Sequence, residues 1–414
     1  MVFTRRVKLF ALVAAVIMLT LILGGRAVRP ALADGDIVPN HYIVQLAPSV
    51  GANSNAKVTA VAADLSRAYG LRVSLVYDVA ITGFAARIPA SRLERLMADP
   101  RVLSVEPDRV VTIQAQTLPT GIDRIDGELS STVSGNGSGA VNVDVAVLDT
   151  GIQTNHPDLN VVGGKNCSTG NSYADGHGHG THVSGTIAAK DDGNGVVGVA
   201  PGARLWAVRV LNNQGSGTTS TIICGINWVT ANAGTIEVVN MSLGGSGSDS
   251  TCPGSDAYHN AICNSVNAGV TYVVAAGNSA ANANNFRPAT YSEVITVSAL
   301  ADFNGQPGGG GAATCRSDVD DTLADFSNYG SDVDLIAPGV CIYSTYRGSA
   351  YATMSGTSMA SPHVAGAAAL YKSNNPGATP AQVKAALIAA ANSNWNNAGD
   401  PDGIKEPLLN VDGL

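Results

Sequence analysis

This chain is organised around one stretch, Gly356-Thr357-Ser358-Met359-Ala360-Ser361-Pro362-His363. A flexible Gly-Thr pair delivers a serine to the point where an apolar, helix-like run begins, at residues 364–371. The first N–H groups of a helix have no partner within the helix, and they favour negative charge nearby. Ser358 is therefore a candidate nucleophile, and the alternative is an ordinary serine cap at the start of a helix.

Two further stretches supply the partners that a nucleophilic serine needs. The apolar run at 145–148 predicts a buried strand, and Asp149 follows at its end, where turn chemistry is the alternative role. The second stretch, His177-Gly178-His179-Gly180-Thr181-His182, supplies a base. Serine catalysis requires a base within hydrogen-bonding reach, and the base requires a carboxylate that holds its tautomer and stabilises the imidazolium.

Together the three stretches resemble the subtilase family of serine peptidases, which includes subtilisin and proteinase K. In subtilisin the catalytic aspartate, histidine and serine follow one another along the chain in this same order. The resemblance covers roughly residues 115–390, and it implies Ser358 as nucleophile, His179 as base and Asp149 as its orienting carboxylate. The family places the base at the first histidine of His-Gly-Thr-His, so His182 is expected to pack on the helix that follows.

The resemblance also assigns a group that stabilises the oxyanion of acyl transfer. Asn278 follows an apolar run at 273–276, where an asparagine turn after a strand is the alternative. By resemblance, the Asn278 amide and the backbone N–H of Ser358 form the oxyanion hole, which requires donors held in place before reaction.

Two segments match the family segments that line the primary specificity pocket, Ser242-Leu243-Gly244 and Ala275-Ala276-Gly277. Ordinary strand core is the alternative for both. Their walls are small and apolar and carry no acidic residue, which predicts broad, apolar-leaning specificity rather than cleavage after basic residues. Phe286 is expected near the pocket floor, where it would narrow the pocket.

Structural calcium is a further implication of the resemblance. Residues 190–196 align without gaps on the high-affinity calcium loop of subtilisins, and hard Ca²⁺ takes six to eight oxygen ligands. The implied ligands are the side chains of Gln116, Asp158 and Asp192 with the backbone of Lys190, Asn194 and Val196. A solvated acidic loop is the alternative. A weaker second site is expected from Asp332, Asp334 and the carbonyls of Ala289, Tyr291 and Val294.

Strand-like and helix-like segments alternate between residues 141 and 390. Strands are predicted at 143–148, 204–211, 237–243, 270–276, 294–300 and 333–337, and helices at 181–189, 219–232, 256–267, 358–373 and 380–391. Continuous apolar strands that alternate with helices are typical of a parallel sheet covered on both faces. The fold class is therefore α/β, a subtilisin-like, predominantly parallel sheet flanked by helices. The acidic residues Asp318, Asp320 and Asp321 are expected in a solvated loop.

A second, smaller domain is predicted at residues 34–114. Its segments follow the order β-α-β-β-α-β of a small α+β, ferredoxin-like domain, with strands at 42–46, 73–77, 83–88 and 102–113. Helices are expected at 55–69 and 91–98, the second capped by Ser91. The domain resembles the inhibitory propeptide that precedes many subtilases. Processing is expected near Gln114–Ala115, which leaves a peptidase domain at 115–414.

Residues 1–33 predict an export signal. Basic residues at positions 5, 6 and 8 precede an apolar core at 9–23, and Ala31-Leu32-Ala33 is a small-residue cleavage site. The core is shorter than the roughly 20 residues of a spanning helix, although an uncleaved membrane anchor is the alternative. We expect a secreted protein with no membrane attachment once the signal is removed.

Charge and cysteine content narrow the remaining possibilities. The formal net charge is −8, and no basic run suggests a nucleic-acid partner. Six cysteines in an exported chain suggest three disulfides, for which 15 pairings are possible. Proximity favours Cys252–Cys263, and Cys315–Cys341 and Cys167–Cys224 would follow. The expected partners are peptide and protein substrates and the chain's own propeptide, acting on a monomer.

Two other functions compete with a self-processing serine endopeptidase. One is a catalytically inactive subtilase-fold binding protein, against which the intact set of Asp149, His179 and Ser358 argues. The other is a metalloenzyme built on His177, His179 and His182, which would be sensitive to zinc chelators and indifferent to Ser358→Ala.

Overall fold

A computed structural model describes residues 37–50, 54–109, 116–249 and 251–414 of the chain. The expected export signal and processing site lie outside these residues. The chain divides into two compact units, Met1–Ile113 and Gln114–Leu414, and each is described by itself. Within the described residues, no helix is both long and apolar enough to cross a membrane.

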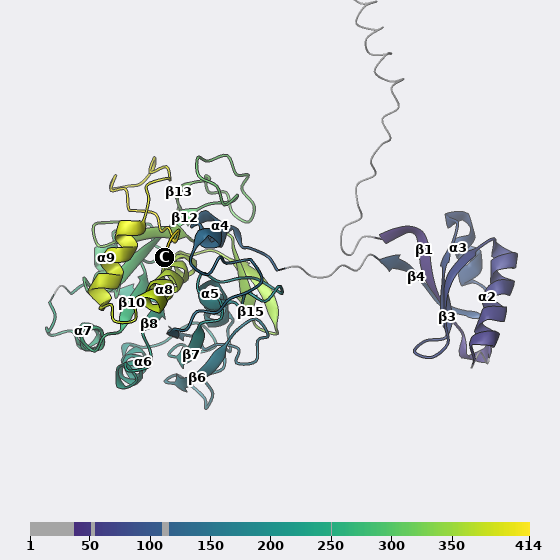
Figure 1. The fold of residues 1–414 in the computed structure, drawn as a ribbon, viewed down its shortest axis with the longest axis horizontal. Helices are drawn as coiled ribbons and strands as arrows, with labels where there is room; N and C mark the ends of the chain where they lie inside the picture. The colour runs from purple at the N-terminus through teal and green to yellow at the C-terminus, as the bar shows by residue number, and fades with distance from the viewer. Residues whose placement is uncertain (1–36, 51–53, 110–115, 250) are drawn as a thin grey trace, which may run out of the picture. The chain divides into compact units, whose positions relative to one another are not determined.

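The N-terminal unit is a four-stranded antiparallel sheet with two helices (Figure 1). Its elements follow the predicted order: β1 (Ile37–Leu46), α2 (Asn55–Tyr69), β2 (Arg72–Tyr77), β3 (Gly83–Arg87), α3 (Ala90–Met97) and β4 (Val102–Arg109), with a 3₁₀ turn at Pro48–Val50. The strands lie side by side as β2-β3-β1-β4. Val44, Val58, Leu65 and Phe84 form the buried core between helices and sheet.

The predicted cap of the second helix in this unit is wrong. Helix α3 begins at Ala90 with Pro89 at the capping position, and no side chain caps it. Proline suits a helix start because its missing N–H would have no partner in the first turn anyway. Ser91 therefore lies inside the first turn.

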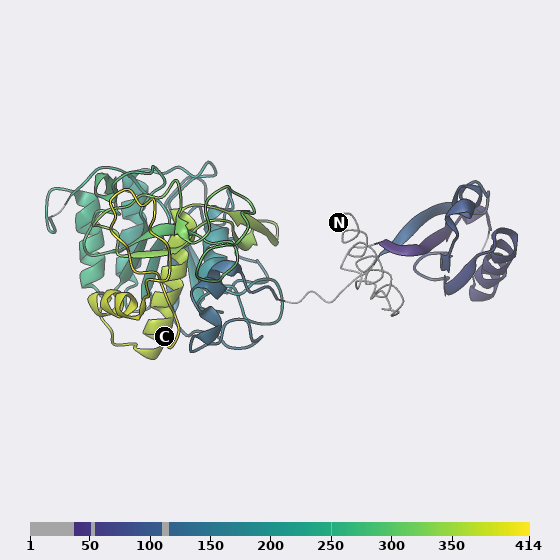
Figure 2. The ribbon, with the colours of Figure 1, turned by 90° about the horizontal axis from the view of Figure 1, so that it is seen from above.

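The C-terminal unit is built on an eight-stranded sheet with helices on both faces (Figures 1 and 2). The strand order is β13-β12-β10-β8-β5-β7-β6, with β14 also beside β12, and each neighbouring pair is parallel except β12 with β13. The strands span β5 (Asp144–Asp149), β6 (Val161–Asn166), β7 (Arg204–Arg209), β8 (Val238–Met241), β10 (Thr271–Ala275), β12 (Ile295–Ala301), β13 (Thr322–Leu323) and β14 (Leu335–Pro338). All six strands predicted for this unit are present, and β6 and β13 are additional.

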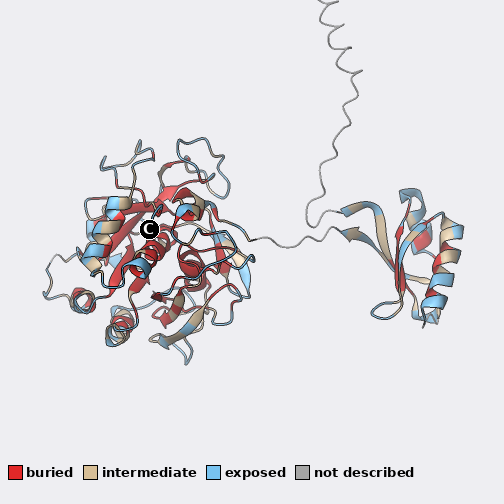
Figure 3. Ribbon diagram, in the orientation of Figure 1, coloured by how far each residue is buried: buried red, intermediate tan, exposed pale blue. Residues whose placement is uncertain are grey.

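Strand β5 shows how the two faces are covered. Val145 and Val147 face a core shared with α5 (His179–Ala188), α8 (Thr357–Asn374) and α9 (Pro380–Ala390). Ala146 and Leu148 face the opposite core, shared with α6 (Thr219–Ala231) and α7 (Ala257–Asn267). Both faces are therefore sealed from water, and Figure 3 shows the sheet as largely buried. The five predicted helices are confirmed, with ends shifted by up to two residues.

Several short elements complete the C-terminal unit. A helix, α4 (Thr120–Arg124), precedes β5, and a two-stranded hairpin pairs β15 (Ile342–Tyr346) with β16 (Ala350–Met354). A second small sheet pairs β9 (Gly245–Ser246) with β11 (Phe286–Arg287). Two 3₁₀ turns lie at Gly127–Leu129 and Ala283–Asn285.

All six cysteines form disulfides in the expected pairs, Cys167–Cys224, Cys252–Cys263 and Cys315–Cys341. They join loops to helices or to other loops of the C-terminal unit. A covalent link of this kind restricts the unfolded chain, so the three bonds stabilise the folded unit.

Candidate active site

Asp149 ends β5 at the carboxyl edge of the sheet, where ligand sites of open α/β folds lie. Its side chain is fully buried, and the N–H of Thr150 donates to its Oδ1 at 2.7 Å. Nδ1 of His179 lies 2.8 Å from Oδ1 and 2.9 Å from Oδ2 of the same carboxylate. This contact fixes the imidazole with Nδ1 as donor, which leaves Nε2 free to accept a proton.

His179 is the first residue of α5, and the approach of this helix to β5 depends on the glycine that follows. A Cβ at Gly180 would lie 2.0 Å from the carbonyl oxygen of Gly151 and 3.2 Å from Cβ of Asp149. Only glycine allows this close approach. Burial by itself would lower the pKa of His179, but the carboxylates of Asp149 and Asp175 raise it above its ordinary value.

Asp175 is a positioning residue that the sequence analysis missed. Its Oδ1 accepts the N–H groups of His177 and Gly178, both at 2.8 Å, and its Oδ2 accepts the hydroxyl of Thr181 at 2.6 Å. The Thr150 hydroxyl also donates to Oδ1, at 2.9 Å. Asp175 thus ties the start of α5 to the turn after β5. The sequence signal was an acidic residue just ahead of a predicted helix start.

Ser358 lies in the first turn of α8. The helix begins at Thr357 with Gly356 at the capping position, so Ser358 is not the cap. Pro362 has no N–H, and the carbonyl of Ser358 therefore lacks the intrahelical donor four residues later. The hydroxyl of Ser242 supplies one instead, at 2.8 Å. In return, the Ser358 hydroxyl donates to the carbonyl oxygen of Ser242 at 3.3 Å.

Asn278 is held by its side-chain oxygen, which accepts the N–H of Thr357 at 2.8 Å and the Thr357 hydroxyl at 2.9 Å. Its amide nitrogen is thereby directed away from Thr357. A Cβ added at Gly356 would lie 3.4 Å from Nδ2 of Asn278 and 3.6 Å from the backbone nitrogen of Ser358. Two N–H donors therefore border the same small space, which the absence of a side chain at Gly356 keeps open.

Two pockets adjoin the residues described above, and Leu243 and Gly244 line both of them. One, of about 280 Å³, is lined by Ser358 and Asn278 together with Ala275, Ala276, Gly277 and Phe286. The other, of about 490 Å³, is lined by His177, His179, Leu211 and Ser242 with neighbouring glycines. The structure brings together all the residues predicted for substrate binding.

Comparison with known proteins agrees with this geometry. The model of the subtilase family matches residues 141–405, and that of the peptidase inhibitor I9 family matches residues 41–114. The chain belongs to the subtilase family. It is 42% identical to subtilisin DY of Bacillus licheniformis over 302 residues, which cover 72% of this chain and 98% of that protein. It is 39% identical to subtilisin E of Bacillus subtilis over 355 residues, 84% of this chain and 84% of that protein.

A solved structure, that of a cold-adapted subtilisin-like serine proteinase, matches with a TM-score of 0.57 and 37% identity. The match covers 71% of this chain and 98% of that one. This subtilase is therefore a serine endopeptidase preceded by an inhibitor-type domain.

Two other histidines of the subtilase are unsuited to act as a base. Nε2 of His182 donates to the carbonyl oxygens of Ile342 and Ala352, at 3.1 and 3.0 Å, and is therefore not free to accept a proton. Burial lowers the pKa of His182 to about 4, and the same cause lowers the pKa of His363 to about 4. Among the described residues, the three histidines at 177, 179 and 182 form no potential metal cluster.

Four of the six residues expected at the first calcium site converge in the subtilase. The amide of Gln116 lies 2.5 Å from the carbonyl oxygen of Lys190 and 3.0 Å from that of Val196. Asp158 accepts the N–H of Val196 at 3.0 Å. Gln116 Oε1 and Asp158 Oδ1 are buried without a hydrogen-bond partner in the described structure. Unpaired oxygens beside two carbonyls fit a hard cation. The Asp192 carboxylate instead accepts the N–H of Asn194, at 3.1 Å.

The second expected calcium site is a poor fit, because a lysine already supplies the cation. Nζ of Lys384 lies 2.8 Å from Oδ1 of Asp334 and 2.8 Å from the carbonyl oxygen of Val294. The Ala289 carbonyl accepts the hydroxyl of Thr296 at 2.7 Å. A divalent ion placed here would meet the positive charge of Lys384 at close range. A second cation site, formed by Ala289, Tyr291, Val294, Asp332 and Asp334, stays a prediction.

Proposed function

We propose that this subtilase is an exported zymogen that processes itself and hydrolyses peptide bonds through Asp149, His179 and Ser358. The observation that carries the proposal is a pair of contacts, one at His179 and one at Asn278. The Asp149 carboxylate holds His179 by Nδ1, and the amide of Asn278 is anchored beside the N–H of Ser358. In this proposal His179 is the base, Asp149 orients it, and Asn278 with the Ser358 N–H forms the oxyanion site for the Ser358 hydroxyl.

In the proposed reaction, the Ser358 hydroxyl attacks the carbonyl carbon of the scissile bond while Nε2 of His179 takes its proton. The Asp149 carboxylate stabilises the imidazolium that forms. Negative charge develops on the former carbonyl oxygen, and Nδ2 of Asn278 and the Ser358 N–H donate to it. The imidazolium then protonates the leaving amine, and an acyl-enzyme forms. Water, activated by the same base, releases the acid and restores the serine.

The smaller of the two pockets determines which substrate side chains the enzyme accepts. Its lining of Ala275, Ala276 and Gly277 is small and apolar. Arg287 also lines it, but its guanidinium is paired with Asp256 at 2.8 Å and is therefore not free to select an acidic side chain. Phe286 limits the depth available. We therefore propose broad, apolar-leaning specificity, with Ser242-Leu243-Gly244 adding an extended substrate as a further strand.

We also propose that Ca²⁺ is held by Gln116, Asp158 and the carbonyls of Lys190 and Val196, with Asp192 and Asn194 turning inward to complete the site. The ion would neutralise the buried Asp158 carboxylate, whose pKa burial raises to about 6. Its contribution would be to stability, because it would join the segment around Gln116 to the loop at 190–196 and take no part in acyl transfer.

The N-terminal unit is proposed as the inhibitor of its own peptidase. It matches an inhibitor family over residues 41–114, and its sheet carries exposed apolar side chains, with Leu75 59% and Leu103 58% exposed. Val102 and Val105 of the same strand as Leu103 pack against the core. The family match over residues 41–114 is what supports this role.

The intact mass of secreted wild type, compared with Ser358→Ala, tests the proposal. A product beginning near Ala115 holds 300 of the 414 residues and is expected at about 30 kDa, against 42.0 kDa for the whole chain. Only the wild type is expected to lose residues 1–114, whereas the variant should lose the signal alone. Equal processing of both chains would refute self-processing. Retention of the propeptide by both, without peptidase activity, would favour the inactive binding protein.

A further inference from the structure

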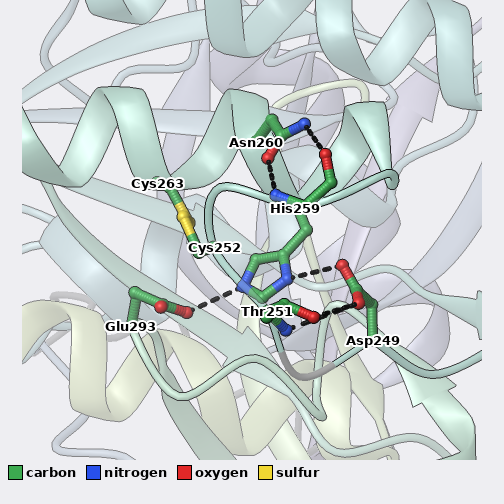
Figure 4. The surroundings of a disulfide bond; sticks show 8 residues. Asp249, Thr251, Cys252, His259, Asn260, Cys263 and Glu293 are labelled. Carbon is green, nitrogen blue, oxygen red and sulfur yellow. Dashed lines mark hydrogen bonds and ion pairs between the residues drawn. A yellow bond between two sulfur atoms is a disulfide. The ribbon is translucent and has the colours of Figure 1, made fainter.

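Four potential metal ligands gather at one end of α7, in a part of the molecule that the proposed reaction does not use. His259 and Cys263 are four residues apart on α7 and so lie on one face of the helix. Cys252 comes from the loop before the helix, and Glu293 from the segment before β12 (Figure 4). One ligand atom from each lies within 4.8 Å of those of the other three.

The imidazole of His259 is held in a fixed orientation. Its Nδ1 lies 3.0 Å from Oδ2 of Asp249, and its Nε2 lies 2.8 Å from Oε2 of Glu293 (Figure 4). The ring stacks on Tyr291 with centroids 3.9 Å apart and planes 3° apart. A carboxylate on Nδ1 that aims Nε2 at neighbouring ligands is the usual second-shell arrangement of a metal-binding histidine.

We propose that this cluster is a redox-dependent site for Zn²⁺. When the bond between Cys252 and Cys263 is reduced, the two thiolates, Nε2 of His259 and a carboxylate oxygen of Glu293 bind one ion. Two sulfur, one nitrogen and one oxygen ligand form a four-coordinate set that suits zinc, whereas calcium and magnesium prefer oxygen alone. Asp249 is the positioning residue that orients His259.

The size of the cluster fits such an ion. Zinc bonds of about 2.0–2.3 Å place tetrahedral ligands roughly 3.3–3.8 Å apart. The four ligand atoms all lie within 4.8 Å of one another, so side-chain rotation, which separates the two sulfur atoms once their bond is broken, brings them to this spacing. The site is also reachable, because the Glu293 side chain is 28% exposed and that of Asp249 is 17% exposed. The buried His259 supplies the inner ligand.

The chemistry balances with a trialkylphosphine as the reductant. The phosphine takes the oxygen of one water molecule and becomes the phosphine oxide, while the disulfide of Cys252 and Cys263 accepts two electrons and two protons to give two thiols. Zinc binding then releases both thiol protons to solvent. His259 releases the proton that Nε2 shares with Glu293. The metal replaces the covalent bond as the link between the loop at 252 and α7.

Metal titration of the full chain tests the proposal, in the Ser358→Ala background so that no self-digestion occurs. The chain is reduced with a phosphine, freed of reductant under inert gas and titrated with Zn²⁺ or Co²⁺ in excess Ca²⁺. We expect one zinc per chain after reduction and none before, and a cobalt spectrum with thiolate charge-transfer bands. Cys167→Ser/Cys224→Ser is the matched control, which removes another disulfide and should still bind one zinc.

Ligand variants separate this site from incidental binding. Cys252→Ser/Cys263→Ser should bind no zinc, and Glu293→Gln, at a partly exposed position, should bind at least tenfold more weakly. Asp249→Asn should weaken binding roughly 10–100-fold, the range for loss of a second-shell carboxylate. Near-ultraviolet circular dichroism checks that each reduced chain is folded. Failure of the folded, reduced chain to bind zinc, or undiminished binding by Cys252→Ser/Cys263→Ser, would overturn the proposal.

Discussion

The side-chain oxygen of Asn278 accepts two hydrogen bonds from one residue, the backbone N–H and the hydroxyl of Thr357, at 2.8 and 2.9 Å. The same Thr357 hydroxyl accepts the N–H of Gly277 at 3.1 Å. Thr357, which precedes the proposed nucleophile Ser358, thus fixes the orientation of an amide in the loop after β10. An oxyanion donor that is held before reaction needs no reorganisation when charge develops.

We expect Thr357→Val to lower kcat with little change in KM. Valine keeps the shape and the backbone N–H but removes the hydroxyl, so the Asn278 amide loses one of two anchors. The fall should be smaller than the roughly 10²–10³ seen when the oxyanion asparagine itself is replaced, a magnitude that comes from subtilisin, a relative. Steady-state kinetics on a peptide substrate measures it. Thr357→Ser is the control and should retain activity, and a Thr357→Val enzyme with unchanged kcat would show that the second anchor is dispensable.

The pair formed by Ser242 and Pro362 predicts a non-additive effect on stability. Ser242→Ala leaves the Ser358 carbonyl without its donor, which should cost on the order of 1–3 kcal/mol in the free energy of unfolding. Pro362→Ala restores an N–H four residues after that carbonyl. Ser242→Ala should therefore cost less in the Pro362→Ala background than alone. Denaturant unfolding of the four chains, in the Ser358→Ala background, measures the coupling, and equal costs in both backgrounds would contradict this account.

The strands and helices of the sheet could be predicted from the sequence more completely than the loops. Strands and helices such as β5 and α8 are predictable because both are buried along most of their length, which requires a continuous run of apolar or small residues that is visible locally in the sequence. The acidic loop was predicted wrongly. Asp320 and Asp321 are buried, where Asp321 accepts from Arg124 at 2.7 Å and from the N–H of Gly309 at 2.7 Å. Arg124 is 197 residues away in sequence, so no local pattern reveals that partner.

The same limit explains the calcium sites. The oxygens that converge around Gln116 and Asp158 could be predicted because the loop at 190–196 aligns without gaps on a known calcium loop. At the second set, Lys384 of α9 pairs with Asp334, and no local pattern reveals this partner because it comes from a distant part of the chain. The β15–β16 hairpin was also missed, since β15 buries Ile342, Ser344 and Thr345 without a regular alternation and β16 buries no residue fully.

Removal of calcium should lower thermal stability and leave the chemistry of a folded enzyme intact. An ion bound only by the native state stabilises it by mass action, so excess chelator should lower Tm. Asp158→Asn should lower Tm in calcium and reduce the further effect of chelator, because the amide cannot replace the charge. Differential scanning calorimetry of the Ser358→Ala chain measures both. An unchanged Tm in excess chelator would contradict the site.

The ammonium group of Lys384 should stabilise the fold through its ion pair with Asp334. Lys384→Met leaves Asp334 without its ion-pair partner and removes the donor to the Val294 carbonyl, so we expect a loss on the order of 1–3 kcal/mol. Asp334→Asn in the same chain should recover part of that loss, since it removes the unpaired charge. Denaturant unfolding of the single and double variants tests this. Equal or greater loss in the double variant would show that the ion pair is not what stabilises this region.

Glu406 should make the folded enzyme less stable as the solution becomes alkaline. Its side chain is 1% exposed, and neither carboxylate oxygen has a hydrogen-bond partner among the described residues. Burial, with a smaller contribution from Asp400 and Asp402, raises the pKa of Glu406 to about 8, against 4.5 for the ordinary group. Between these values the native chain keeps a proton that the unfolded chain has lost. Stability due to this group is therefore present below pH 4.5 and decreases by about 1.4 kcal/mol per pH unit until pH 8.

Glu406→Gln isolates this contribution, because glutamine keeps the size of the neutral acid and cannot ionise. The variant should match the wild type near pH 4.5 and become progressively more stable than it toward pH 8. Unfolding free energies of both chains across that range, in the Ser358→Ala background and at fixed calcium, give the difference directly. Asp402→Asn is the control at an exposed position in the same loop and should show a much smaller pH-dependent gain. A difference between wild type and Glu406→Gln that does not grow with pH would contradict a raised pKa of Glu406.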